Sequence, residues 1–335
     1  MTANATSRRI LLTGAAGNTG RVIAEVLHAR GVPCVVMTHS PANRDAFQAR
    51  GLHAVLGDFD APDTLRQALH GIDAAYLVCT PDEKLIPRET AFIRAAQQAG
   101  VRHIVLCSAY LSGEAAETQN LRSHGVIEKT LRESGLAYTI LRPVGFMQTF
   151  TQFIWDMVQQ ADAVSLPAGD GGMALIDVRD VAQVAVKALT EPGHEGQVYD
   201  LTGPESLSLH RQAAILSQVL GRRITYVPSQ EAELARVMAV LGVPATPSEH
   251  VLKVFRMQRE CRLEVVLPTL RQLGIEPSTY SQFLADYIAG RTRGGNSFQP
   301  PDTLPIRLFN WAGLRLLRVR AAHLRWTQAR RSPTR

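Results

Sequence analysis

Short apolar runs alternate with segments of helical periodicity through the first half of the chain. Apolar runs bounded by turn residues predict buried strands, here at residues 10–13, 34–37, 54–56, 74–78, 104–107 and 138–141. Amphipathic spacing predicts helices between them, from residue 21 onward and over 43–50, 62–70, 87–99 and 120–134. Left-handed helix caps are expected at the glycines that follow helical segments, namely Gly31, Gly51, Gly71, Gly100 and Gly135. This alternation predicts an α/β fold with a parallel, doubly wound sheet.

The pattern loosens after residue 143. Aromatic and Met side chains crowd the segment 146–157, which predicts either a helix packed in the core or part of an apolar substrate pocket. A helix is predicted over 181–190, where Asp180 can serve as its N-terminal cap. A strand at 197–201 follows it. The second half therefore adds fewer strands than the first.

The domain organisation follows from these patterns. A first domain is predicted over 8–204, in which 143–175 contribute to the substrate pocket. Residues 205–289 are mostly helical and predict a small C-terminal lobe. Gly and Pro residues gather after this lobe, so 290–305 is predicted to be a linker. The remaining residues, 306–335, form a basic amphipathic tail.

A glycine-rich turn joins the first predicted strand to the first predicted helix. Gly14 can take the unusual backbone angles of the turn, Gly17 lets the backbone approach a ligand, and Gly20 lets the helix pack closely on the strand. Backbone N–H groups at the start of a helix bind phosphate groups, so this position favours dinucleotide binding over an ordinary turn. The spacing G-x-x-G-x-x-G differs from the usual G-x-G-x-x-G. The residues predicted to bind the pyrophosphate are Gly14, Ala16, Gly17, Asn18, Thr19 and Gly20.

The end of the second strand suggests which dinucleotide binds. No acidic residue stands there to bind the ribose 2′-hydroxyl of NAD. His39 and Arg44 are instead placed to meet a 2′-phosphate, which favours NADP (NADPH) over NAD. A surface charge on the following helix is the alternative interpretation of Arg44.

The next two strand ends offer further cofactor contacts. Asp58 can hydrogen-bond the adenine amino group, with Phe59 flanking the ring, or Asp58 can cap the helix that opens near Pro62. Cys79 and Thr80 end the fourth strand, where the nicotinamide ribose is expected. Both interpretations of Asp58 stay open at the level of sequence.

Composition narrows the class of protein. The 335 residues are 45% hydrophobic and 20% charged, which is ordinary for a globular protein with a sizeable core. Four scattered Cys residues show no metal-ligand spacing, so we expect buried thiols in a reducing compartment and no metal site. With neither a signal peptide nor a run of about 18 apolar residues, a cytoplasmic protein is expected.

The positive net charge of +6 comes from the C-terminal tail. Residues 301–335 hold eight Arg and one Asp, whereas 1–300 hold 28 basic and 29 acidic residues. The body of the chain therefore has no nucleic-acid footprint, and no nucleic-acid partner is expected. A helix over 306–326 with one apolar side can contact an anionic membrane or a protein partner. A solvated tail is the alternative.

Several stretches together resemble one known family. They are Thr13–Gly20, Gly57–Asp60, Val105–Ser108, Ser134–Pro143, Ile176–Ala182 and Gly196–Pro204. In these stretches the chain resembles the NmrA-like group of atypical short-chain dehydrogenases/reductases over about residues 8–288. The resemblance implies a Rossmann-type domain with a small C-terminal lobe and NAD(P)H-dependent reduction of quinones or azo compounds. It also admits a redox-sensing regulator.

The acid–base groups of typical short-chain reductases are missing. None of the seven Tyr residues has a Lys four positions later, so the Tyr-x-x-x-Lys pair is absent. In related proteins a Lys or His often stands fourteen residues before the Tyr-Thr of the next strand. That count reaches His124 from Tyr138, so the resemblance implies a cofactor-site or catalytic role for His124. Pro143 is expected beside the nicotinamide on the same grounds.

Candidate substrate contacts lie after the fifth and sixth strands. Ser108 and Tyr110 can orient a substrate carbonyl, and Ser108 also borders the predicted cofactor site. Phe146, Met147 and Phe150 can supply apolar walls. We therefore expect an NAD(P)H-dependent reductase that passes hydride to a small apolar, quinone-like acceptor. A non-catalytic NAD(P)-binding sensor is the alternative.

Overall fold

A computed structural model of the protein describes residues 8–292. The predicted tail at 306–335, and the predicted linker beyond residue 292, lie outside the described residues. The chain divides into two compact units. The first comprises the residues up to Val144, with Ile176–Thr202 and Leu267–Pro277; the second comprises Gly145–Leu175, Gly203–Val266 and the described residues from Ser278 onward.

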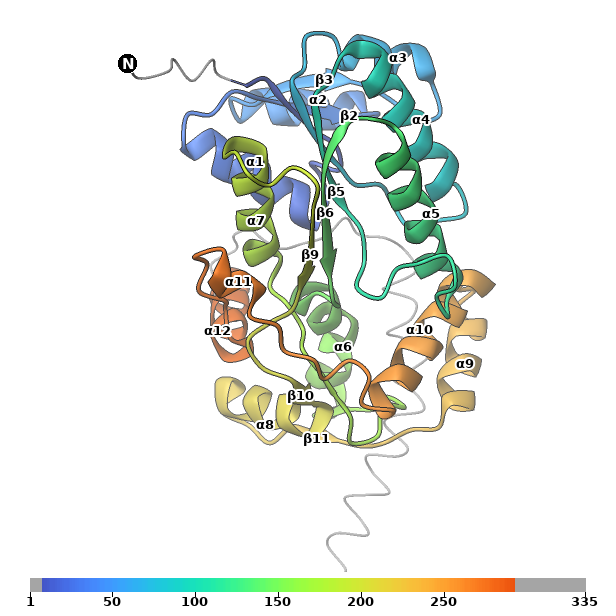
Figure 1. The fold of residues 1–335 in the computed structure, drawn as a ribbon. Coiled ribbons are helices and arrows are strands. Elements are labelled where there is room, and N and C mark those ends of the chain that lie inside the picture. The colour runs from blue at the N-terminus through green and yellow to red at the C-terminus, as the bar shows by residue number, and fades with distance from the viewer. Residues whose placement is uncertain (1–7, 293–335) are drawn as a thin grey trace, which may run out of the picture. The chain divides into compact units, whose positions relative to one another are not determined.

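The first unit is built on a parallel sheet of seven strands in the order β3-β2-β1-β4-β5-β6-β9 (Figure 1). Each strand pairs in parallel with its neighbours, and β1 lies between β2 and β4. The strands are β1 (Ile10–Leu12), β2 (Cys34–Thr38), β3 (His53–Leu56), β4 (Ala74–Leu77), β5 (His103–Cys107), β6 (Ala137–Pro143) and β9 (Gln197–Leu201). Strands β2 and β3 are added on one side of β1, and β4 and the later strands on the other, so the order of the strands reverses between β1 and β4. Ligands are therefore expected at the carboxyl ends of β1 and β4. The predicted doubly wound α/β sheet is confirmed.

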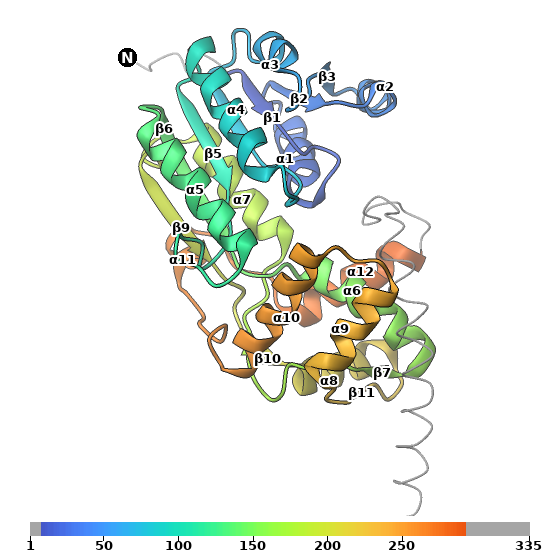
Figure 2. The same cartoon turned by 90° about the vertical axis from the view of Figure 1, so that its right-hand side faces the viewer.

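Helices cover both faces of this sheet, with α1 and α7 packed together on one face and α3, α4 and α5 on the other (Figure 1, Figure 2). Leu11, Leu77 and Ile104 from the strands meet Phe92 and Ile127 from the helices in one buried cluster. The helices of this unit are α1 (Asn18–Ala29), α2 (Pro41–Ala49), α3 (Pro62–Ala68), α4 (Leu85–Ala99), α5 (Gln119–Glu133), α7 (Val178–Thr190) and the short α11 (Thr269–Gln272). On α1 the apolar residues Val22, Ile23 and Leu27 are buried, as expected for an amphipathic helix.

The second unit is mostly helical, as predicted for 205–289. Tyr280 and Phe283 stack at 6.0 Å between ring centroids, and Trp155 meets Tyr287 edge-on at 5.4 Å. Its helices are α6 (Met147–Ala161), α8 (Leu209–Leu220), α9 (Glu231–Val240), α10 (Ala245–Arg259) and α12 (Tyr280–Thr292). Two short pairs accompany them: β7 (Ala163–Val164) with β11 (Thr225–Tyr226), and β8 (Gly172–Met173) with β10 (Leu207–Ser208).

The structure differs from the sequence predictions in three details. The helix expected from residue 181 begins at Val178, and its cap is Asp177 rather than Asp180; the Asp177 side chain accepts a hydrogen bond from the Arg179 N–H at 2.8 Å. The compact units do not divide at residue 204, because 145–175 belong to the second unit. Of the four thiols only Cys107 is buried, and Cys261 is exposed.

Candidate functional site

The glycine-rich loop folds into a tight turn at the carboxyl end of β1. Gly14 has φ +60°, which is the left-handed region that favours glycine. A Cβ on Gly20 would lie 2.4 Å from the Gly14 carbonyl oxygen, and a Cβ on Gly17 would lie 3.1 Å from the same oxygen. The close approach of α1 to the loop therefore requires glycine at residue 20, and the positive φ favours glycine at residue 14; at residue 17 a side chain would only be tight.

Hydrogen bonds to residues at the end of β4 hold the loop in place. The Thr13 hydroxyl accepts a hydrogen bond from the Val78 N–H at 2.8 Å. Tyr76, which is fully buried, donates its hydroxyl hydrogen to Thr19 Oγ1 at 2.8 Å. Since the Thr19 side chain faces the core, its contribution to a bound phosphate would come through the backbone N–H.

This loop fits the pyrophosphate of a dinucleotide. Gly14, Ala16 and Gly17 are exposed, and no side chain caps the first turn of α1. No acidic residue lies in that turn, so nothing there repels an anion. An uncapped helix N-terminus with exposed backbone is a common anion site. The predicted phosphate-binding residues thus lie together on one exposed loop.

The side chains predicted to recognise a 2′-phosphate follow β2. Ser40 caps α2 by accepting a hydrogen bond from the Asn43 N–H at 3.3 Å. His39 is exposed beside it, and the Arg44 guanidinium pairs with the adjacent Asp45 at 2.8 and 2.9 Å. A bound phosphate would therefore compete with Asp45 for Arg44.

Asp58 and Phe59 follow β3 at the same edge of the sheet. Asp58 does not cap α3, because Ala61 occupies the cap position without a side-chain hydrogen bond. The Asp58 carboxylate instead accepts a hydrogen bond from the Asp60 N–H at 2.9 Å. The Phe59 ring packs against Phe92 at 5.8 Å and stays half-buried. The capping interpretation of Asp58 was therefore wrong, and its adenine contact stays a prediction.

An ion-pair network links the segment after β3 to the start of α4. Arg88 contacts Asp60 at 2.7 Å and Asp82 at 2.8 Å, and Lys84 contacts Asp60 at 3.3 Å. Hydrogen bonds from Arg88, together with Lys84, lower the pKa of Asp60 to about 2. The network thus spans the loops that border the predicted adenine and ribose positions.

Cys79 and Thr80 lie between β4 and α4. Thr80 is exposed, whereas Cys79 is half-buried and burial raises the pKa of its thiol to about 11. Cys79 therefore stays a neutral thiol at physiological pH and is not an activated nucleophile.

Sequence reasoning missed a buried polar cluster around Glu128 on α5. This carboxylate is 1% exposed and accepts hydrogen bonds from the hydroxyls of Ser108 and Ser112, both at 2.6 Å. It also pairs with Arg142 at 2.8 Å and Arg132 at 3.0 Å. Burial raises its pKa, but the hydrogen bonds from Arg142 and the two serines outweigh burial, and the pKa lies below its ordinary value.

The cluster changes what Ser108 can do. Its N–H donates to the Leu141 carbonyl at 2.8 Å, and its hydroxyl hydrogen is directed to Glu128. Ser108 is 5% exposed. In this arrangement Ser108 joins β5 to α5 and has no hydroxyl hydrogen left to donate to a substrate.

His124 lies one turn before Glu128 on α5. Thr118 caps this helix by accepting a hydrogen bond from the Leu121 N–H at 3.1 Å. His124 is 8% exposed, so little of its surface is available to a cofactor or substrate. Its role stays a prediction.

Among the predicted polar residues at this edge of the sheet, Tyr110 is better placed than Ser108 or His124 to contact a substrate. Its N–H donates to the Pro143 carbonyl at 2.9 Å, which joins the end of β5 to the end of β6. Its hydroxyl has no hydrogen bond to any residue in the described range, and the ring is half-buried. Burial raises the pKa of Tyr110, so the hydroxyl keeps its proton at neutral pH and can donate it to an acceptor oxygen.

The predicted apolar walls belong to the second unit. Phe146 is the cap of α6, and Met147 and Phe150 lie in its first turn. Met147 is buried, while Phe146 and Phe150 are half-buried. The crowded segment is thus a helix with a buried side, and a contribution to the substrate pocket stays a prediction.

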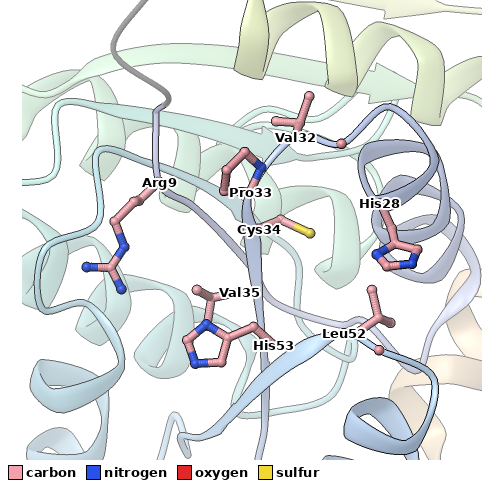
Figure 3. A pocket seen from close by; sticks show the side chains of 10 residues that line it. Arg9, His28, Val32, Pro33, Cys34, Val35, Leu52 and His53 are labelled. Carbon is pink, nitrogen blue, oxygen red and sulfur yellow. The ribbon is translucent and has the colours of Figure 1, made fainter.

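A hollow of about 370 Å³ lies at the opposite edge of the sheet, at the amino ends of β2 and β3 (Figure 3). Arg9, His28, Cys34 and His53 line it. It is remote from the glycine-rich loop along the strands and is not the predicted site. Within the described range, no group of three or more His, Cys, Asp or Glu side chains can hold a metal ion, and no helix is long and apolar enough to cross a membrane.

Comparison with known proteins agrees with this geometry. Residues 6–281 match the NmrA-like family, so the chain belongs to that family. It is 31% identical over 283 residues to an NAD(P)H azoreductase of Xenophilus azovorans, covering 84% of this chain and 98% of that protein. It is 34% identical over 270 residues to a (4-alkanoyl-5-oxo-2,5-dihydrofuran-3-yl)methyl phosphate reductase of Streptomyces griseus, covering 80% and 94%.

A solved structure extends the comparison to the fold. The NADPH complex of an NADPH-dependent quinone oxidoreductase from Escherichia coli is 27% identical, with a TM-score of 0.75 over 83% of this chain and 99% of that one. The chain is therefore an NAD(P)H-dependent oxidoreductase of the atypical short-chain type with a Rossmann-type fold. The predicted family and enzyme class are confirmed.

Proposed function

We propose that this enzyme transfers hydride from NADPH to a quinone-like acceptor. The observation that carries the proposal is the pairing of an exposed glycine-rich loop with a site that offers a hydroxyl but lacks the Lys of a Tyr-x-x-x-Lys pair. Tyr110 supplies that hydroxyl, and Glu128, the buried carboxylate nearby, is held as an anion by Arg142. Such a site suits an acceptor that needs little acid catalysis.

The cofactor would be held by backbone and by a few side chains. The N–H groups around Gly17 would bind the pyrophosphate, and Asp58 with Phe59 would contact the adenine. When bound, reduced nicotinamide supplies a hydride. A quinone that takes up this hydride and one proton from solvent becomes a hydroquinone, leaving oxidised nicotinamide. The Tyr110 hydroxyl would hydrogen-bond a quinone oxygen and orient the acceptor.

The preference for NADPH would depend on Arg44. Its guanidinium lies on the first turns of α2 and already binds one carboxylate, that of Asp45. Arg–phosphate pairs are stronger than exposed Arg–carboxylate pairs, so a 2′-phosphate would displace Asp45. The Escherichia coli quinone oxidoreductase described above was solved with NADPH, which supports this choice of cofactor.

The quinone-like acceptor has similar support. The relatives act, by their names, on azo compounds, a furanone phosphate and quinones. Azo groups and quinones are both planar, conjugated electron acceptors. The shared chemistry is a planar conjugated system that accepts a hydride, and we propose the same class for this chain.

Purified full-length protein with NADPH or NADH and a panel of quinones and azo dyes tests the proposal. We expect NADPH oxidation that depends on the acceptor, with a lower KM for NADPH than for NADH. Arg44→Ala should raise the KM for NADPH by roughly tenfold and leave NADH unchanged, since one charged hydrogen-bonded contact is worth about 1.5 kcal/mol or more. Asp45→Ala, its matched control, should lower the KM for NADPH.

The contrary outcomes are distinct. Binding of NADPH without oxidation by any acceptor would support a sensor instead of a reductase. Equal losses of NADPH and NADH affinity in Arg44→Ala would remove Arg44 from 2′-phosphate recognition.

Gly20→Ala should abolish binding of both cofactors, because its Cβ would overlap the Gly14 carbonyl.

A further inference from the structure

Leu111 has a backbone conformation that large side chains avoid. Its φ is +62°, in the left-handed region. Among the described residues, two other non-glycine residues have positive φ: Asp162 and Cys261. Asp162 is the C-terminal cap of α6, a position where Asp is tolerated. A bulky residue in this region is a true outlier, and such outliers concentrate at functional sites.

The chain on both sides of Leu111 is fixed by specific contacts. On one side the Tyr110 N–H donates to the Pro143 carbonyl at 2.9 Å. On the other side the Ser112 hydroxyl donates to Glu128 at 2.6 Å. A strained residue persists only where its surroundings determine the backbone, and these two contacts do so.

The loop also lies directly on the backbone of α5. A Cβ on Gly125 would come 2.4 Å from the carbonyl carbon of Gly113. The Gly113 N–H donates to the Leu121 carbonyl at 3.3 Å. These contacts fix the position of the turn at 108–113 relative to α5, and with it the position of Leu111.

Glu128 is the centre of this arrangement. One carboxylate oxygen accepts hydrogen bonds from Ser108, Ser112 and Arg142, and the other pairs with Arg142 and Arg132. A buried carboxylate with this many donors is rigid. It ties both ends of the turn to α5 and to the end of β6.

The fixed turn presents an apolar side chain to solvent. Leu111 is 37% exposed, although it stands four residues after the fully buried end of β5. It follows the carboxyl end of a central parallel strand, where ligands of such sheets bind. An exposed, strained apolar side chain at that edge has no evident role in stability.

We propose that Leu111 is a specificity-determining residue that contacts the apolar part of the acceptor, and that Glu128 is the positioning residue that holds it there. The inference rests on the proposed reductase function. The isobutyl group of Leu111 would pack against the face of a planar acceptor, while the Tyr110 hydroxyl beside it in sequence would bind an acceptor oxygen. Acceptors with a larger apolar surface would gain more from Leu111.

Two substitutions at residue 111 separate contact from strain. Leu111→Ala removes the apolar contact and keeps the need for a positive φ. Leu111→Gly removes the contact and also relieves the strain, because glycine adopts this φ readily. Cys261→Gly is the matched control, since Cys261 has φ +59° and lies in the second unit.

The experiment uses the full chain with two quinones of different size, 1,4-benzoquinone and 2-methyl-1,4-naphthoquinone. Leu111→Ala and Leu111→Gly should both raise the KM for the naphthoquinone by roughly three- to tenfold, the loss expected for a few buried methyl and methylene groups. The KM for benzoquinone should change less. Leu111→Gly should have a higher Tm than Leu111→Ala, and NADPH affinity should be unchanged in both.

Glu128→Gln tests the positioning role. It should raise the KM for the naphthoquinone more than that for benzoquinone, with NADPH affinity unchanged. A purely structural role would lower the Tm without altering the ratio of the two KM values. Unchanged KM ratios in both Leu111 variants, or the same change in Cys261→Gly, would overturn the proposal even if Glu128→Gln fails to fold.

A binding measurement separates this inference from the proposed function. Equilibrium dialysis of the naphthoquinone with NADP⁺ requires no turnover. If the wild type oxidises no NADPH but binds the naphthoquinone, and Leu111→Ala weakens that binding, the reductase proposal fails and the Leu111 contact stands. Equal binding by the wild type and Leu111→Ala, or no saturable binding by the wild type, overturns the Leu111 contact.

Discussion

Two neighbouring helices on one face of the sheet each bury a glutamate, and the two carboxylates have opposite surroundings. Glu128 on α5 is 1% exposed and is bonded to two arginines and two serines. Glu89 on α4 is 0% exposed, and neither of its oxygens has a hydrogen-bond partner of good geometry in the described part of the chain. The two carboxylates are thus equally buried, but among the described residues only that of Glu128 has hydrogen-bond partners of good geometry.

The difference decides the charge of each group. Burial raises the pKa of Glu89 to about 8, and the nearby N–H of Cys79 offsets only part of that effect. At neutral pH Glu89 is therefore mostly protonated, while Glu128 is an anion. Ion pairs therefore stabilise the surroundings of Glu128, whereas Glu89 is accommodated by apolar packing only while its carboxyl group stays protonated.

The largest expected effect is the loss of stability at Glu89 as the pH rises. The folded pKa of about 8 lies above the ordinary value of 4.5, so the folded protein binds a proton that the unfolded chain releases. The stabilisation is complete below pH 4.5 and is lost as the pH rises through 8. Its size is roughly 4–5 kcal/mol at 1.36 kcal/mol per unit of pKa.

Urea unfolding at pH values from 5 to 9 measures this effect. Glu89→Gln keeps the shape of the protonated acid and cannot ionise, so its unfolding free energy should fall less with pH than that of the wild type. The difference between the two curves isolates Glu89 from other titrating groups, among them His103, whose pKa burial lowers to about 4. Parallel curves would mean that Glu89 is ionised in the folded protein.

The next largest effect is expected from breaking the Glu128 pair. Arg142→Leu leaves a buried carboxylate without its main partner, and such changes cost about 3–5 kcal/mol; we expect about 3, because Arg132 stays in contact. The matched control is Arg102→Leu. Its pair with Asp73 is exposed, so that change should cost about 0.5 kcal/mol.

Urea unfolding at pH 7 compares the two variants. Equal losses would mean that the Glu128 cluster contributes no more than a surface ion pair. Arg142→Lys should fall between the wild type and Arg142→Leu, because Lys keeps the charge and loses the two-pronged geometry.

The fold was predictable because its signals are local. Apolar strands, amphipathic helices and glycines such as Gly100 and Gly135 at positive φ are written in short stretches of sequence. The helix start at Val178 was missed by three residues, because Asp177 and Asp180 are equally good caps by type. The short strand pairs of the second unit carry only two residues each and leave no periodic signal.

The candidate site was predictable only in part. The glycine-rich loop has a sequence signature, so its residues could be placed together before the structure was known. Glu128, Ser112 and Arg142 come from three separate segments and meet only through the order of the strands, so no local pattern marks them. The strain at Leu111 is invisible in sequence, because a leucine gives no sign of a positive φ.

The smallest expected effect concerns a single hydrogen bond of the Glu128 cluster. Ser112→Ala removes one donor from an oxygen that keeps Ser108 and Arg142, so we expect a loss of about 1 kcal/mol. In the Glu128→Gln background the same change should cost less, because the acceptor is then neutral, and urea unfolding of the four proteins measures that coupling. A loss independent of the residue at 128 would show that Ser112 acts through packing of the turn. The stabilisation of Glu128 would then differ less from that of Glu89 than the hydrogen bonds suggest.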